Sequence, residues 1–163
     1  MFQEKEMIVY GSHGICEVEH IGRLNMPMVD PNKLYYTLQP KREKASHIYA
    51  PVENNKTIMR KLLTKEEAKE LLGHVAKLDT LWITNDRERE SCYKEAIRSC
   101  DCEELIRIIK TLYLRKQKRV EDGKKPTAID ERYFHQAEEQ LYGELSFVLK
   151  LDKEEIRKQI CWE

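Results

Sequence analysis

The sequence has no apolar run close to the roughly 18 residues that a membrane-spanning helix needs. Its first ten residues, MFQEKEMIVY, are too polar for a signal peptide. It also has no excess of one charge, since Lys plus Arg and Asp plus Glu number 29 each. These absences predict a cytoplasmic protein that does not bind nucleic acid through its bulk charge.

Cysteine is sparse and is spaced for neither a disulfide framework nor a zinc ribbon. The five cysteines include no Cys-x-x-Cys pair and are Cys16, Cys92, Cys100, Cys102 and Cys161. The Cys100-Asp-Cys102 couplet could react or bind a metal, but we interpret it as a helix junction built from small residues. We therefore expect reduced and mostly buried thiols, with no metal and no cofactor.

Histidines and carboxylates form no catalytic pattern. Metal-ligand spacing is missing among the five histidines, which are His13, His20, His47, His74 and His135. Exposed helix faces or capped first turns are the expected places of the carboxylates Glu103, Glu104, Glu138, Glu139 and Glu144. The turn Gly11-Ser-His-Gly14 follows a strand, but no helix pattern follows it, so it is not a phosphate loop. The sequence predicts a protein that is not an enzyme and leaves a hydrolase as a remote alternative.

The hydrophobic period changes once along the chain, near residue 62. Short extended runs predict strands at about 7–10, 15–25, 34–38, 46–50 and 57–62. Beyond them, a short polar residue precedes an acid by three positions five times, which predicts helices at about 65–73, 86–99, 102–121, 128–149 and 153–160. The expected caps are Thr64, Asn85, Asp101, Thr127 and Asp152. We expect an α+β protein, with a small antiparallel β-barrel at 1–62 and an all-α bundle of five helices at 63–163.

Positive charge gathers locally on the predicted helices. From Lys110 to Lys125 there are seven Lys or Arg and two acids, a local excess of five. Arg87, Lys94 and Arg98 are spaced to share one helix face. Such flexible cations suit phosphate contacts that read no sequence. The alternative is a solvated helix end, where Lys and Arg offset the helix dipole.

Trp82 lies in a short apolar linker just before the second predicted helix. An indole beside Arg87 suits a wedge or stacking contact with nucleic acid. The flanking Leu78, Leu81 and Ile83 favour a seam between domains instead, and a protein hot spot is a third possibility. We predict a divided role, with the indole partly buried against the helical core and one edge exposed.

Six short segments occur in an order that resembles the CarD family of bacterial transcription regulators. They are Tyr10-Gly-Ser-His-Gly14, Leu34-Tyr-Tyr-Thr-Leu38, Ile48-Tyr-Ala-Pro-Val52 with Asn54, Tyr93-Lys94, Leu112-Tyr-Leu-Arg-Lys116 and Tyr142-Gly-Glu-Leu145. The resemblance implies a Tudor-like or SH3-like domain, shared with the transcription-repair coupling factor, that binds the RNA polymerase β subunit. It further implies a helical domain that touches promoter DNA and stabilises the open complex. We expect a monomer.

Carried over by position, the resemblance implies a polymerase-binding set of Arg23, Leu24, Tyr36, Tyr49 and Pro51. Two family arginines are replaced here, one by Leu24 beside Arg23 and the other by Tyr49, two residues before Pro51. The family tryptophan lies four residues before the Tyr-Lys pair, where this chain has Arg89, while Trp82 lies eleven before Tyr93. The predicted DNA-binding set is Trp82, Arg87, Arg89, Lys94, Arg98, Lys116, Arg119, Lys124 and Lys125. The alternative function is a protein-only adaptor that binds a partner strand and has no DNA role.

Overall fold

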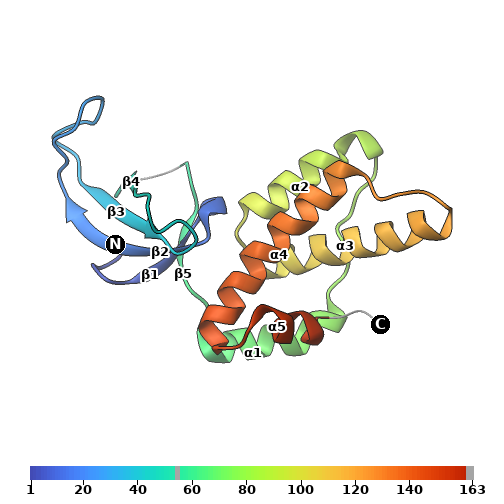
Figure 1. Ribbon diagram of the computed structural model, residues 1–163. Coiled ribbons are helices and arrows are strands. Elements are labelled where there is room, and N and C mark those ends of the chain that lie inside the picture. Colours follow the sequence, from blue (N-terminus) through green and yellow to red (C-terminus); the bar gives the residue numbers. More distant parts are fainter. Residues whose placement is uncertain (54–55, 161–163) are drawn as a thin grey trace. The chain divides into compact units, whose positions relative to one another are not determined.

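The chain folds as two compact units, Met1–Leu62 and Leu63–Glu163 (Figure 1). The computed structural model describes residues 1–53 and 56–160, so Asn54 and Cys161 lie outside the described residues. Each unit has its own buried apolar cluster. The division falls where the hydrophobic period of the sequence changes.

The N-terminal unit is a five-stranded antiparallel sheet with the strand order β4-β3-β2-β1-β5. The strands are β1 (Met7–Tyr10), β2 (Ile15–Gly22), β3 (Tyr35–Pro40), β4 (Ile48–Pro51) and β5 (Met59–Lys61). The pairing of β2 with β3 shifts register between Val18 and His20, which marks a bulge in the longest strand. β4 and β5 end the sheet, and each pairs with a single described strand.

Side chains at alternate positions of the strands form the core of the sheet. The buried side chains are Ile8, Cys16, Val18, Tyr36, Leu38 and Ala50. Successive strand residues point to opposite faces, so Tyr36 lies on the buried side while Tyr35 and Thr37 are partly exposed. The Tyr36 hydroxyl accepts the Phe2 N–H at 3.1 Å and so ties the start of the chain to the sheet.

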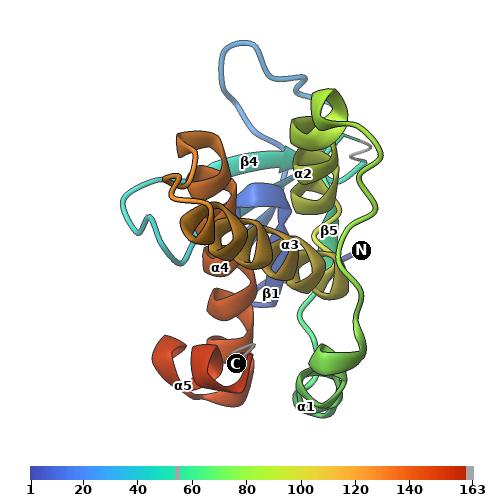
Figure 2. The same ribbon diagram turned by 90° about the vertical axis from the view of Figure 1, so that its right-hand side faces the viewer.

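The described part of the C-terminal unit, residues 63–160, contains five α-helices. They are α1 (Lys65–His74), α2 (Arg89–Arg98), α3 (Cys102–Glu121), α4 (Ala128–Leu149) and α5 (Lys153–Gln159). α4 packs against each of the other four, and Figure 2 shows α1 and α5 at the end of the unit where α4 finishes. The predicted stripe of Leu105, Ile108, Ile109 and Leu112 is buried. The predicted α+β organisation is therefore confirmed, and no helix among the described residues is long and apolar enough to cross a membrane.

Side-chain caps begin four of these helices as the sequence predicts. The caps that accept a backbone N–H of the first turn are Thr64, Asp101, Thr127 and Asp152. Asn85 differs, because it accepts the Arg87 N–H and caps a 3-10 turn at Asp86–Glu88. α2 begins only at Arg89, so the predicted helix over 86–99 is wrong at its start. A side chain that caps a tighter turn explains the difference.

Two carboxylates of α4 that were expected on an exposed face are buried. Glu144 is 2% exposed; its Oε2 accepts the Leu63 N–H at 3.0 Å and its Oε1 accepts the Cys102 S–H at 3.3 Å. Glu138 is also buried and lies 3.3 Å from the guanidinium of Arg157. The expectation of exposure is wrong because the donors come from other elements, which the sequence of α4 does not reveal. Glu144 consequently fixes the first residue of the helical unit.

The Cys100-Asp-Cys102 couplet is the junction between α2 and α3. Cys100 adopts a left-handed conformation with φ 55°, Asp101 caps α3, and both thiols are buried. This agrees with the interpretation of the couplet as a helix junction.

Candidate functional site

The β4 end of the sheet brings together two of the residues predicted to bind polymerase. Gly22 pairs with Tyr35 and Tyr35 pairs with Pro51, so Arg23 follows directly on a row that crosses three strands. Arg23 and Pro51 line one hollow of about 350 Å³. The other residues that line it are Asn32, Lys33, Leu34, Val52 and Glu53.

Tyr49 lies on the same edge strand as Pro51 and two residues before it. Its side chain is 42% exposed, and its backbone is paired with Thr37 of β3. Leu24 is partly exposed. Tyr49, Pro51 and Arg23 thus form a surface that a partner can reach, at the edge where β4 has no second neighbour among the described strands.

Tyr36 does not belong to this surface. It is 2% exposed and part of the core of the sheet, so it cannot touch a partner while the sheet is folded. Strand alternation in Tyr-Tyr-Thr-Leu could have shown this, because Tyr36 shares a face with Leu38. Sequence reasoning missed Leu34 and Val52, which strand pairing brings together through the Val52 N–H to Leu34 carbonyl bond at 3.0 Å.

Trp82 stands out from the helical unit and is 88% exposed. Its neighbours Leu81 and Ile83 are partly buried against the helical core, which Trp82 does not join. The predicted partial burial of the indole against that core is therefore wrong. The two flanking residues supply the apolar packing, and the residue between them is left outside.

The cations near Trp82 differ in their availability. Arg87 in the 3-10 turn and Arg98 at the end of α2 are exposed, without an ion pair or side-chain hydrogen bond among the described residues. Lys94 is exposed one helical turn before Arg98, and its ammonium lies 3.8 Å from Glu90. Exposure of this kind leaves all three side chains able to reach a phosphate.

Arg89 is held inside the helical unit. Its guanidinium, with a side chain 21% exposed, donates to Asp86 Oδ1 at 3.0 and 3.2 Å and to the Tyr93 hydroxyl at 3.2 Å. Burial alone would lower the pKa of Arg89, but the bonds to Tyr93 and Asp86 raise it above its ordinary value. The prediction that Arg89 contacts DNA is corrected accordingly, because the side chain is largely buried and three of its five N–H donors already bond within the protein.

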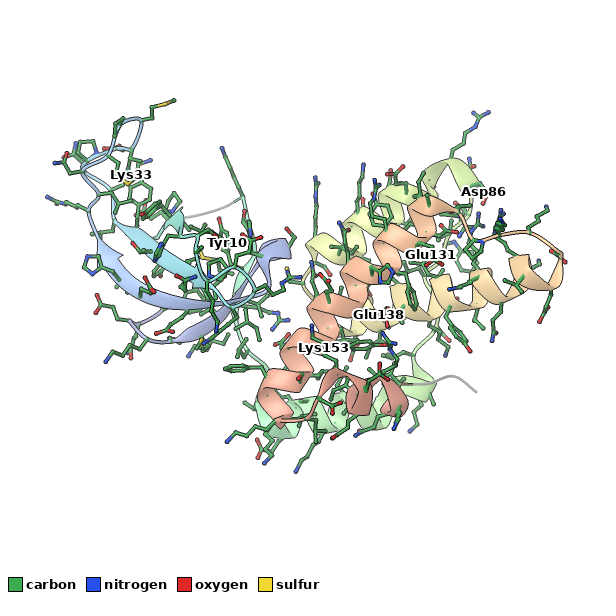
Figure 3. The ribbon with its side chains drawn as sticks, in the orientation of Figure 1. Tyr10, Lys33, Asp86, Glu131, Glu138 and Lys153 are labelled. Carbon is green, nitrogen blue, oxygen red and sulfur yellow. The ribbon has the colours of Figure 1, made fainter. Side chains whose placement is uncertain are left out.

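A buried acid joins α2, α3 and α4. Asp130, in the first turn of α4 beside Glu131 (Figure 3), accepts from Arg115 Nε at 2.8 Å and from the Tyr93 hydroxyl at 3.4 Å. Burial raises the pKa of Tyr93, and the charge of Asp130 raises it further, against the opposing effect of Arg89. Tyr93 of the Tyr93-Lys94 pair is therefore a structural residue.

The basic stretch of α3 is partly neutralised within the protein. Continuing the apolar spacing from Leu112 by three, four and seven positions reaches Arg115, Lys116 and Arg119. Arg115 bonds to Asp130, Lys116 lies 3.2 Å from Glu131, and Arg119 Nε donates to the Lys125 carbonyl at 2.9 Å. Lys110 donates to the Leu78 carbonyl at 2.8 Å. Four of the seven cations from 110 to 125 thus have internal partners.

Lys118, Lys124 and Lys125 complete the seven, and all three are exposed. In the described part of the chain their ammonium groups make no ion pair or hydrogen bond. Gly123, at φ 75°, ends α3, and the Lys124 N–H donates to the Arg119 carbonyl at 2.8 Å. The backbone of this turn is therefore fixed while its ammonium groups stay in solvent. Sequence reasoning missed Lys118, although its place off the apolar spacing signals an outward position.

An apolar groove of about 610 Å³ lies between α3, α4 and α5. Two of its three lining acids are paired, Glu131 with Lys116 and Glu138 with Arg157, and Glu121 is exposed. Among the described residues, no group of three or more His, Cys, Asp or Glu could hold a metal ion.

Comparison with known families assigns the N-terminal unit. The model of the CarD-like/TRCF RID domain matches residues 2–63, which covers the whole sheet and stops just before α1. No curated protein matches the chain. Residues 2–63 of the chain therefore form a CarD-like RNA polymerase interaction domain, which supports a transcription-associated protein that interacts with RNA polymerase.

Proposed function

We propose that this protein is a transcription regulator rather than an enzyme. Its N-terminal unit binds the β subunit of RNA polymerase, and its helical unit stabilises the open promoter complex through phosphate contacts that read no sequence. The match of residues 2–63 to the interaction domain carries the proposal. The accessible surface at β4 supports the first half of it, and the unpaired cations with the exposed Trp82 support the second.

The β4 edge suits a partner that adds a strand. An edge strand offers backbone N–H and C=O groups on its free side, and side chains on alternate positions give specificity. Tyr49 and Pro51 occupy two such positions, and the hollow that contains Arg23 and Leu34 adjoins Pro51. We assign polymerase binding to this edge for these reasons.

The test is capture of purified polymerase, or of a β-subunit fragment, by the full chain. Tyr49→Glu places a charge in the proposed interface and should weaken capture by at least tenfold, since a desolvated, unpaired charge costs roughly 2 kcal/mol or more. Ile58→Glu is the matched control, because Ile58 is 43% exposed but precedes β5 at the other edge. Equal loss in both variants, or none in Tyr49→Glu, would refute the assignment.

A protein-only adaptor is the second candidate, and one observation favours it. Four of the seven cations from 110 to 125 are already bound internally, so the positive surface is weaker than the sequence alone suggests. The two functions differ in salt dependence. Phosphate contacts release counterions, so a DNA-contacting protein should lose affinity for the polymerase–promoter complex steeply with salt. The affinity of a protein-only adaptor should depend on salt equally whether or not promoter DNA is present.

A further inference from the structure

We infer that Thr111, in the middle of α3, is a positioning residue that holds Trp82 in its exposed conformation. The inference rests on the proposed DNA role of the helical unit, and it adds the contact that keeps the indole of Trp82 exposed to DNA. Thr111 itself touches no DNA in this proposal; it acts through the backbone of the linker that carries Trp82.

The linker is bonded to α3 immediately before the indole. The Leu81 N–H donates to Thr111 Oγ1 at 2.9 Å, and the Lys110 ammonium donates to the Leu78 carbonyl at 2.8 Å. Leu78 and Leu81 are partly buried against the helical core. Two bonds and two apolar contacts thus hold the linker within four residues of Trp82.

The Thr111 hydroxyl is fixed as an acceptor for the linker. Its own hydrogen is donated to the Arg107 carbonyl at 2.7 Å, one turn earlier in α3. The bond to the Arg107 carbonyl selects one of the two χ1 rotamers that Thr adopts in a helix, and in it the oxygen accepts from the Leu81 N–H. Thr111 Oγ1 is therefore a fixed hydrogen-bond acceptor on α3 for the linker.

The linker is also held after the indole. Ile83 packs on the helical core, and the Asn85 side chain accepts the Arg87 N–H at 3.0 Å. Asp86, at the start of the 3-10 turn (Figure 3), accepts from Arg89. An indole between two anchored neighbours cannot easily fold inward, although burying it would be favourable for an indole of this size.

Such an arrangement lowers the entropic cost of inserting the indole beside a base step. Ordering a loop on binding costs free energy, and a segment that is already ordered avoids this cost. Loss of the Thr111 bond should therefore weaken the DNA contact of Trp82 without removing the indole.

The first test follows Trp82 in the free protein. With Trp162→Phe as background, Trp82 is the single tryptophan of the chain. Thr111→Val removes the hydroxyl at nearly constant volume, and Thr111→Ser keeps it. We expect a lower fluorescence anisotropy of Trp82 in Thr111→Val and a value in Thr111→Ser close to that of the background, at unchanged circular dichroism. Equal anisotropy in all three proteins would overturn the inference, whatever the fate of the proposed function.

The second test is the lifetime of open complexes with polymerase. Thr111→Val should shorten this lifetime roughly two- to tenfold, which is the ratio that corresponds to the net free energy of one hydrogen bond. Thr111→Ser should restore the lifetime. In the Trp82→Ala background Thr111→Val should have no further effect, because both changes then act on one contact. An equal effect in both backgrounds would refute positioning. If Trp82→Ala alone changes nothing, the proposed DNA role of Trp82 fails, and the anisotropy still decides whether Thr111 orders the linker.

Discussion

Replacing Lys124 and Lys125 together by alanine should reduce the salt dependence of binding to the polymerase–promoter complex. Both ammonium groups are exposed and lack internal partners among the described residues, so the change removes charge without breaking a bond. The bond from Arg119 to residue 125 uses a backbone carbonyl, which alanine keeps. The fold of the α3–α4 turn should therefore be unaffected.

The magnitude follows from counterion release. Each phosphate contact with duplex DNA contributes about 0.9 to the slope of log affinity against log salt, so two lysines account for about 1.8. Doubling the salt concentration should then weaken binding of the unmodified protein about 3.5-fold more than binding of the variant. Because phosphate contacts read no sequence, the difference should be similar on different promoters.

The assay measures affinity for polymerase alone and for polymerase on promoter DNA over a range of salt. The difference between the two slopes isolates the DNA contribution from the contact with polymerase. Lys153→Ala with Lys158→Ala is the matched control, since both lysines are exposed on α5 (Lys153 is labelled in Figure 3) and the net charge changes equally. Equal slopes for the variant and the control would refute phosphate contact at the α3–α4 turn, and a loss confined to one promoter would refute its independence of sequence.

Two further predictions concern stability. In Glu144→Gln one of the two donors, the Leu63 N–H or the Cys102 S–H, faces an amide NH₂ instead of a carboxylate oxygen, so the free energy of unfolding measured in urea should fall by about 1–3 kcal/mol. Glu70→Gln on the exposed face of α1 is the control and should be neutral; equal stabilities of the two variants would contradict the role of the Glu144 carboxylate. Burial raises the pKa of the Cys16 thiol from 9.0 to about 11, against the opposing charge of Arg42. The thiol therefore ionises in the unfolded chain at a lower pH than in the folded sheet, so the stability of the sheet should fall as the pH rises from 9 toward 11 and should not change for this reason below 9. Cys16→Ala should show a smaller fall over that range, and an identical fall would count against the buried thiol as its cause.

The features that the sequence predicted well depend on residues close together in the chain. Thr64, Asp101, Thr127 and Asp152 each cap a helix through a bond that spans two or three residues, so the local pattern contains the whole interaction. Asn85 shows the limit of such a pattern. The same spacing of polar residue and acid is compatible with a 3-10 turn, and packing decides between the two.

The features that the sequence did not predict depend on partners far along the chain. The bond between Leu63 and Glu144 spans 81 residues, so the burial of Glu144 could not be inferred from the α4 pattern. Arg89 was assigned to DNA by its position, but Tyr93 and Asp86 accept three of its five N–H donors and hold the side chain inside the unit. For Tyr36 the signal was present and unused, because strand alternation already places it with Leu38.

The bond between Glu144 and Leu63 makes the connection between the two units very short. β5 ends at Lys61 and the Leu63 N–H is bonded to α4, so Leu62 is the one residue between them. Two residues of chain span at most about 7 Å, so a sheet bound to polymerase tethers the helical unit close by. A tether of this length raises the effective concentration of the helical unit at nearby DNA to about the millimolar range or above. Under the proposed function, DNA contacts of the helical unit that are weak on free DNA would then be occupied on the polymerase, and a flexible insertion at Leu62 should weaken them without changing any contact residue.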